Sequence, residues 1–218
     1  MVLPEAIMIK YINIKNIDDR IINKAIKNLE QGGLIAYPTD TSWGIGCSVS
    51  SKQGIAKLRK LKGDFYNYTL TLICSKISQI SDVAELNNSN FKIIKKYTPG
   101  PYVFILPAKN KIEKKVNMKR LEIGVRIPSN PVPIKIINKL EHPIFSITAS
   151  KIMTSREWWD IRYAEENLFE CGWELENIDE IDLILDSGDP LPKVLSTVID
   201  MTVDKINIIR YGIGEIEY

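Results

Sequence analysis

The chain of 218 residues contains one histidine and three cysteines, and both scarcities limit its chemistry. His142 alone leaves little room for a histidine-based metal site or a Ser-His-Asp triad, and its place before Pro143 predicts a surface loop. The cysteines Cys47, Cys74 and Cys171 are far apart and form no CxxC pair. They predict buried thiols rather than a disulfide framework, and we assign no metal-ligating residues.

Long apolar runs are also lacking, since no stretch approaches the length needed to cross a bilayer. The first ten residues lack the small-residue cleavage pattern of a signal peptide. We therefore expect a cytoplasmic protein with no membrane partner. The formal net charge is only +2, which does not imply a surface coated by nucleic acid, although a local basic patch is compatible with that total.

The most informative stretch that is present covers residues 33–47. An apolar run over 34–37 predicts a buried strand, Pro38 ends it, and extended chain resumes over 43–47. Between them lies a turn rich in hydroxyl groups, with Thr39, Thr41 and Ser42. Small and polar residues between two strands suit a ligand that lies against the backbone. A tight turn that merely joins two core strands is the alternative.

The remaining pattern alternates helices with strands, which predicts an α/β layer architecture. Residues 11–17 predict an extended segment, and residues 154–180 predict a helical region with an acidic outer face. Late strands without long helices between them require antiparallel pairs, so the sheet is mixed. With no internal repeat or linker, residues 1–218 form one domain. Helices are expected over 18–31, 51–62, 77–86, 88–97 and 130–140; further strands over 69–74, 102–107, 122–128, 144–148, 182–186, 195–201 and 206–210.

Basic and hydroxyl side chains recur at the ends of these elements. Lys62 closes a helix, Ser196 and Thr197 enter a strand, and Arg210 ends the last strand. Arg126 stands between two apolar residues of a strand, where burial is costly unless it meets an anion. Its guanidinium suits a phosphate or carboxylate ligand. An internal Asp or Glu partner is the alternative. Together these groups predict a pocket for an anionic ligand, with phosphate the first candidate.

Eight short segments together resemble the YrdC/YciO family of threonylcarbamoyl-adenylate synthase-like proteins. They occur in the family order and span about residues 20–212. The segments are 33–41 (GLIAYPTDT), 43–47 (WGIGC), 61–63 (LKG), 99–101 (PGP), 124–128 (GVRIP), 148–150 (TAS), 196–200 (STVID) and 209–212 (IRYG). The resemblance implies a single domain of the YrdC/RibB type, with a twisted mixed sheet flanked by helices and a concave face.

The resemblance also implies an activity. Family synthases join L-threonine, bicarbonate and ATP into threonylcarbamoyl-AMP and release pyrophosphate, and the product serves modification of tRNA. ATP is a substrate, and Mg²⁺ is expected to accompany its triphosphate. Lys62 and Arg126 would be the catalytic residues. Carried over by position, the substrate-binding residues are Thr39, Thr41, Arg126, Thr148 and Ser196, and the nucleotide-binding residues are Lys62, Ser150, Thr197 and Arg210.

Two departures bring the chain closer to the YciO branch. Active synthases carry Lys-x-Arg-Pro where this chain has residues 62–65 (KGDF), and Ser-x-Asn where it has 148–150 (TAS). Asp64 puts a carboxylate where phosphate charge should be neutralised. The alternative function is a YciO-like protein that binds double-stranded RNA, tRNA or the ribosome. Its basic residues would be those of the helix over 51–62 together with Lys92, Lys95, Lys96, Lys109, Lys111, Lys114, Lys115, Lys119 and Arg120, although lysines of this kind also suit a solvated face.

A third possibility is an interaction protein that uses the adjacent pair Trp158 and Trp159. Neighbouring residues on a helix point in different directions, so one of the two indoles would remain exposed to a partner.

Overall fold

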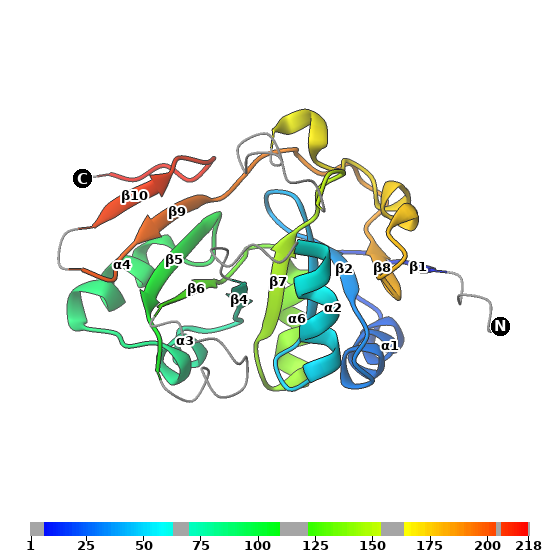
Figure 1. Cartoon of the computed structure of the whole chain (residues 1–218), viewed down its shortest axis with the longest axis horizontal. Coiled ribbons are helices and arrows are strands. Elements are labelled where there is room, and N and C mark those ends of the chain that lie inside the picture. The colour runs from blue at the N-terminus through cyan, green and yellow to red at the C-terminus, as the bar shows by residue number, and fades with distance from the viewer. Residues whose placement is uncertain (1–6, 63–69, 110–121, 154–163, 204–205, 218) are drawn as a thin grey trace.

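The computed structural model describes residues 7–62, 70–109, 122–153, 164–203 and 206–217. In this part of the chain ten strands form one mixed sheet, in the order β1-β8-β2-β3-β7-β4-β6-β5-β9-β10 (Figure 1). The strands are β1 (Met8–Tyr11), β2 (Ile35–Pro38), β3 (Trp43–Ser48), β4 (Thr71–Ile73), β5 (Tyr102–Pro107), β6 (Glu122–Arg126), β7 (Ile144–Thr148), β8 (Leu183–Asp186), β9 (Thr197–Asp200) and β10 (Asn207–Arg210). β8 runs parallel to both β1 and β2, whereas β3 and β7 pair antiparallel at the centre, which confirms the mixed sheet.

Two of the helices begin at capping residues that the sequence indicates. Asp18 accepts a hydrogen bond from the Arg20 N–H at the start of α1, and Asn130 accepts one from Val132 at the start of α6, where proline follows at once. The helices of the described ranges are α1 (Asp19–Glu30), α2 (Lys52–Lys62), α3 (Ile77–Val83), α4 (Asn88–Tyr97) and α6 (Pro131–Leu140), with short 3₁₀ helices η1 (Glu165–Asn167) and η2 (Gly172–Asn177). None of these described helices is long and apolar enough to span a membrane.

Two hydrophobic cores lie on opposite faces of the sheet. α1 and α6 cover one face at β8, β2 and β3, where Tyr37 and Leu185 pack against Ile22 and Ile136. α2, α3 and α4 cover the other face through a second core that includes Leu58, Ile80, Ile94, Phe104 and Phe145. Alternation along each strand assigns successive side chains to opposite faces, so the strand register fixes which residues face which layer.

Beyond β7, the face of the sheet that α1 and α6 cover elsewhere lines a cavity. The register places Thr71 of β4 opposite Gly124 of β6, Gly124 opposite Ile105 of β5, and Val103 opposite Val198 of β9. These residues therefore share the face that α1 and α6 cover on the other half of the sheet. Here their side chains line a cavity instead of packing under a helix. The fold thus leaves half of one sheet face open for a ligand.

Two segments differ from the sequence prediction. Extended chain was expected over residues 11–17, but the strand there, β1, ends at Tyr11. Beyond it the Asn13 side chain accepts the Lys15 N–H, and the chain turns. The helical region expected over 154–180 contains only η1 and η2 in its described part, and residues 154–163, with both tryptophans, lie outside the described residues. Leu168 and Phe169 are consecutive and both buried, which a helix with one apolar face does not allow.

The three cysteines and the single histidine lie close to the environments that the sequence predicts for them. Cys47 and Cys74 are buried in the core, and Cys171 is half-buried. Burial raises the pKa of the Cys47 thiol to about 12. Burial, with a smaller contribution from Asp82, raises the pKa of the Cys74 thiol to about 12 as well. His142 is half-buried in the bend between α6 and β7.

Candidate functional site

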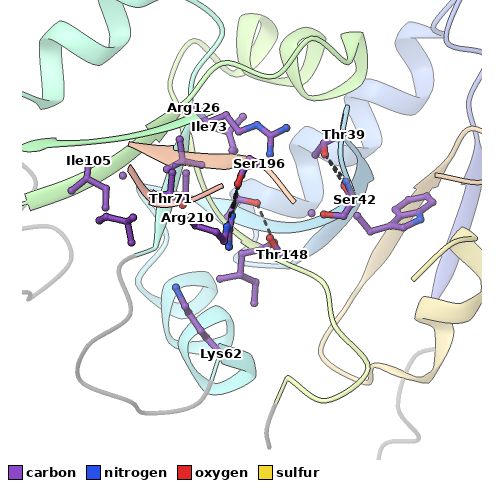
Figure 2. Close-up of a pocket in the computed structure, with 18 residues that line it drawn as sticks. Thr39, Ser42, Lys62, Thr71, Ile73, Ile105, Arg126, Thr148, Ser196 and Arg210 are labelled. Carbon is purple, nitrogen blue, oxygen red and sulfur yellow. Dashed lines mark hydrogen bonds between the residues drawn. The ribbon is translucent and has the colours of Figure 1, made fainter. Parts of the chain in front are cut away.

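A cavity of about 270 Å³ opens at the uncovered half of the sheet and extends to the ends of β3 and β7 (Figure 2). This volume lies just below the range of about 300–1,000 Å³ that is typical of small-molecule sites. Hydroxyl and cationic groups alternate with aliphatic side chains around it. The lining residues are Thr39, Ser42, Trp43, Gly44, Lys62, Thr71, Ile73, Val103, Ile105, Gly124, Arg126, Ser146, Ile147, Thr148, Ser196, Val198, Ile209 and Arg210.

The hydroxyl-rich turn is folded by Thr39. Its hydroxyl donates to the Ser42 carbonyl oxygen at 2.6 Å and accepts the backbone N–H groups of Thr41 at 3.1 Å and Ser42 at 3.2 Å. The Thr39 and Thr41 hydroxyl oxygens are 3.1 Å apart. Either hydroxyl of that pair could be the donor, and the Thr41 oxygen has two lone pairs, so it can also accept from a further group. At least one lone pair of Thr41 therefore remains for another donor.

That donor is Arg126. Its Nη1 donates to the Thr41 hydroxyl at 3.1 Å, and its Nη2 contacts the Asp40 Oδ1 at 2.7 Å. Burial lowers the pKa of the Arg126 guanidinium, and the charge and hydrogen bond of Asp40 oppose that shift. Within the described residues, the buried Arg126 Nε and Asp40 Oδ2 have no hydrogen-bond partner.

The two interpretations of the buried arginine are therefore compatible. Arg126 has the internal carboxylate partner, and it also lines the cavity. The hydrogen bonds to Asp40 and Thr41 use two of its five N–H groups and fix the plane of its guanidinium. A carboxylate or phosphate in the cavity would meet an oriented cation whose charge is partly balanced by Asp40.

A second group of polar side chains faces Arg126 from other elements. Lys62, the last residue of α2, extends toward the part of the cavity where Thr148 and Arg210 lie (Figure 2). Arg210 donates through Nε and Nη2 to the Ser196 carbonyl oxygen, at 3.1 and 2.9 Å, and through Nη2 to the Ser196 hydroxyl at 3.2 Å. Arg210 thus lies beside a hydroxyl group, and Lys62 lines the same cavity.

The structure brings together most, but not all, of the residues predicted from the sequence. Thr39, Lys62, Arg126, Thr148, Ser196 and Arg210 line the cavity. Thr41 does not line the cavity itself, but its hydroxyl accepts a hydrogen bond from Arg126, which does. Ser150 lies beside a separate depression next to η2. Thr197 is fully buried, and its hydroxyl binds the backbone of residues 212 and 214.

The prediction from sequence did not include several strand residues of the sheet that line the cavity and form its floor. Ser146, whose hydroxyl accepts from Tyr37 Oη at 2.6 Å, lies between β3 and β4. Thr71, Val103, Ile105 and Val198 come from three strands that only the register places side by side. The alternation within each strand was readable from the sequence, and it would have indicated these residues once the strand order was known.

Other predicted features lie outside this cavity or outside the described residues. Lys92, Lys95 and Lys96 are on α4, which covers the opposite face, and Lys96 binds Glu217. Asp64 and the basic residues from Lys111 to Arg120 lie outside the described residues. RNA binding therefore stays a prediction. Across the described ranges, no three His, Cys, Asp or Glu side chains are grouped so as to hold a metal ion.

A mixed sheet with half of one face open, and a cavity that an oriented arginine shares with a lysine and a second arginine, characterise an α/β protein with a cationic cavity on its sheet. The chain belongs to the Sua5/YciO/YrdC family, because the sequence model of that family, described as telomere recombination, matches residues 27–212.

Two kinds of relative are similar to this chain. The Escherichia coli protein named uncharacterized protein YciO is 31% identical over 208 residues, which cover 95% of this chain and 96% of that protein. Its crystal structure superposes with a TM-score of 0.78 and covers 96% of this chain and 97% of that one, at 29% identity. A threonylcarbamoyl-AMP synthase of Psychromonas ingrahamii is 31% identical over 132 residues, which cover 59% of this chain and 69% of the synthase.

The fold is also shared with a longer protein. The structure of P. abyssi Sua5 complexed with L-threonine superposes with a TM-score of 0.80 at 23% identity. The match covers 94% of this chain and 57% of that chain. It confirms the twisted mixed sheet expected from the resemblance, and the similarity to YciO along nearly the whole length agrees with the branch that the sequence indicated.

Proposed function

We propose that the protein binds L-threonine and ATP in this cavity and, with bicarbonate, forms threonylcarbamoyl-AMP and pyrophosphate. The observation that carries the proposal is the position of Arg126, buried in β6 and oriented by Asp40 and Thr41, in the same cavity as Lys62 and Arg210. One oriented cation for a carboxylate and two further cations for phosphates match the charges of these two substrates.

The substrates divide the cavity between them. The guanidinium of Arg126 would hold the carboxylate of threonine, and the hydroxyl groups of Thr39 and Ser42 lie at the same end of the lining. Lys62 and Arg210 would hold the phosphates of ATP beside Thr148. Mg²⁺ would arrive with the triphosphate as part of the substrate, since the described residues contain no cluster of three potential protein ligands for it.

The reaction follows in two balanced steps. The neutral amine of threonine attacks the carbon of bicarbonate, and loss of water leaves a carbamate. A carbamate oxygen then attacks the α-phosphorus of ATP, the bond to the bridging oxygen breaks, and pyrophosphate leaves. Lys62 and Arg210 would stabilise the negative charge that grows on the phosphoryl oxygens. The aliphatic floor from Val103, Ile105 and Val198 would limit the access of water to the unstable carbamate.

The test is a direct assay of both products. Purified protein incubated with ATP, Mg²⁺, bicarbonate and labelled threonine should release pyrophosphate and form a labelled adenylate. Arg126→Met should lower the rate by at least about a hundredfold, because the oriented cation is lost. Lys60→Gln is the control for the loss of a cation outside the cavity. Lys60 lies on the same helix as Lys62, but its side chain is 77% exposed, so this variant should leave the rate unchanged. Absence of both products at enzyme concentrations equal to the substrates would refute the proposal.

A further inference from the structure

The position of Arg210 depends on the start of β9. Three of its donor contacts go to Ser196, two of them to the backbone carbonyl oxygen. The pairing of β9 with β10 shifts register between Ile208 and Arg210. A bulge of this kind redirects a side chain. Arg210 therefore faces the cavity only while residues 210–214 keep their path beside residues 195–197.

One buried hydroxyl holds that path. Thr197 Oγ1 donates to the Gly214 carbonyl oxygen at 2.7 Å and accepts the Gly212 N–H at 3.0 Å. The Ile213 N–H donates to the Leu195 carbonyl oxygen at 2.9 Å. A threonine hydroxyl can act as donor and acceptor at once, whereas a methyl group of the same size can do neither. The side chain of Thr197 is fully buried, so water cannot replace these bonds without opening the segment.

The approach of the segment is unusually close. A Cβ atom on Gly212 would lie 2.3 Å from the Leu195 carbonyl oxygen, and one on Gly214 would lie 2.5 Å from the Tyr102 ring. Both positions therefore require glycine. Tyr102 Oη also donates to the Glu215 carbonyl oxygen at 2.7 Å. The chain after β10 thus lies against β9 and β5, held by bonds of Thr197 to residues 212 and 214 and of Tyr102 to residue 215.

We infer that Thr197 is a positioning residue, whose hydroxyl clamps residues 212–214 to the start of β9 and thereby holds Arg210 toward the cavity. Thr197 pairs with Tyr102, one residue away from the pair of Val198 with Val103, so its side chain lies on the face opposite the cavity. It acts through Arg210 rather than on the ligand. The effect on ATP rests on the proposed function, whereas the clamp itself does not.

The test compares Thr197→Val with Thr197→Ser. Valine keeps the shape and removes both hydrogen bonds, and serine keeps the hydroxyl. Thr202→Val is the matched control, because the Thr202 hydroxyl donates to Asp200 at the far end of β9. In Thr197→Val we expect amide hydrogen exchange in residues 210–217 to accelerate at least about tenfold and ATP to bind about ten- to thirtyfold more weakly. Thr197→Ser should restore both within about threefold, and L-threonine affinity should not change.

Two results would overturn the clamp. One is unchanged amide exchange over residues 210–217 in Thr197→Val. The other is an equal loss of ATP affinity in Thr202→Val, which would indicate a general loss of stability. If the wild-type protein does not bind ATP, the proposed function fails. The exchange measurement then still decides the clamp, because it needs no ligand.

Discussion

The buried pair between Asp40 and Arg126 makes a sharp prediction about stability. We consider Asp40→Asn, which keeps the shape of the side chain and one acceptor oxygen but removes the negative charge. The side chains of Asp40 and Arg126 are 13% and 8% exposed, and the contact between them is 2.7 Å. The substitution leaves the Arg126 charge buried without its counter-charge.

The expected cost follows from that burial. Breaking a buried ion pair by removing one partner costs about 3–5 kcal/mol. Because asparagine still accepts a hydrogen bond, we expect the lower end, about 3 kcal/mol of unfolding free energy. For a chain of this length such a loss lowers the melting temperature by roughly 6–12 °C. An exposed pair behaves differently, and loss of the Lys60 pair with Glu180 should cost at most about 1 kcal/mol.

The assay is urea unfolding followed by circular dichroism, on the wild type, Asp40→Asn, Arg126→Met and the double variant. The double variant removes both charges, so it should be more stable than the sum of the single losses predicts, with a coupling energy of at least about 2 kcal/mol. Lys60→Gln is the exposed control. A loss below about 1 kcal/mol in Asp40→Asn, or additive single losses, would refute the conclusion that Asp40 compensates the buried charge of Arg126.

Four further outcomes follow from the core. Native protein at pH 8 should be alkylated by iodoacetamide at Cys171 alone among its cysteines, because burial raises the pKa of Cys47 and Cys74 to about 12, whereas all three should react in urea. For the same reason the unfolding free energy should fall as the pH rises from about 9 toward 12, since the unfolded thiols ionise first; a flat profile in urea titrations would contradict this. Gly46→Ala should cost about 1–3 kcal/mol, because its Cβ would lie 2.9 Å from a carbonyl oxygen of β7, and Tyr37→Phe about 1 kcal/mol, both measured by urea unfolding.

Most of the sheet was predictable because its strands are short apolar runs bounded by prolines and by residues that cap helices. Pro38 ends β2, and the capping Asn130 with its following proline begins α6. The region around Leu168 and Phe169 was not predictable in the same way. There the carboxylate of Glu174 binds the backbone N–H groups of residues 170 and 171, and such local side-chain bonds compete with a regular helix.

The site was predictable in its charges but not in its geometry. Arg126 stood out because a cation between two apolar residues of a strand is costly to bury, whereas Lys62 and Arg210 stood out by their positions at the ends of a helix and a strand. The hydroxyl groups were harder, since Thr197 and Val198 are neighbours in sequence and lie on opposite faces of β9. Which of them faces a ligand depends on strand pairing between segments about a hundred residues apart, and a single sequence does not state that pairing.

The order of strands also bears on how the chain folds. β8 lies between β1 and β2 in the sheet, so each of these two strands pairs with β8 rather than with the other. β8 follows both of them in sequence by well over a hundred residues. β5 likewise meets β9 across a long separation. Because such contacts must wait for distant parts of the chain, we expect slow folding in one cooperative transition. A nascent chain released before residue 183 would lack the strand that unites its amino-terminal edge with the rest of the sheet, and it would present open strand edges to other chains.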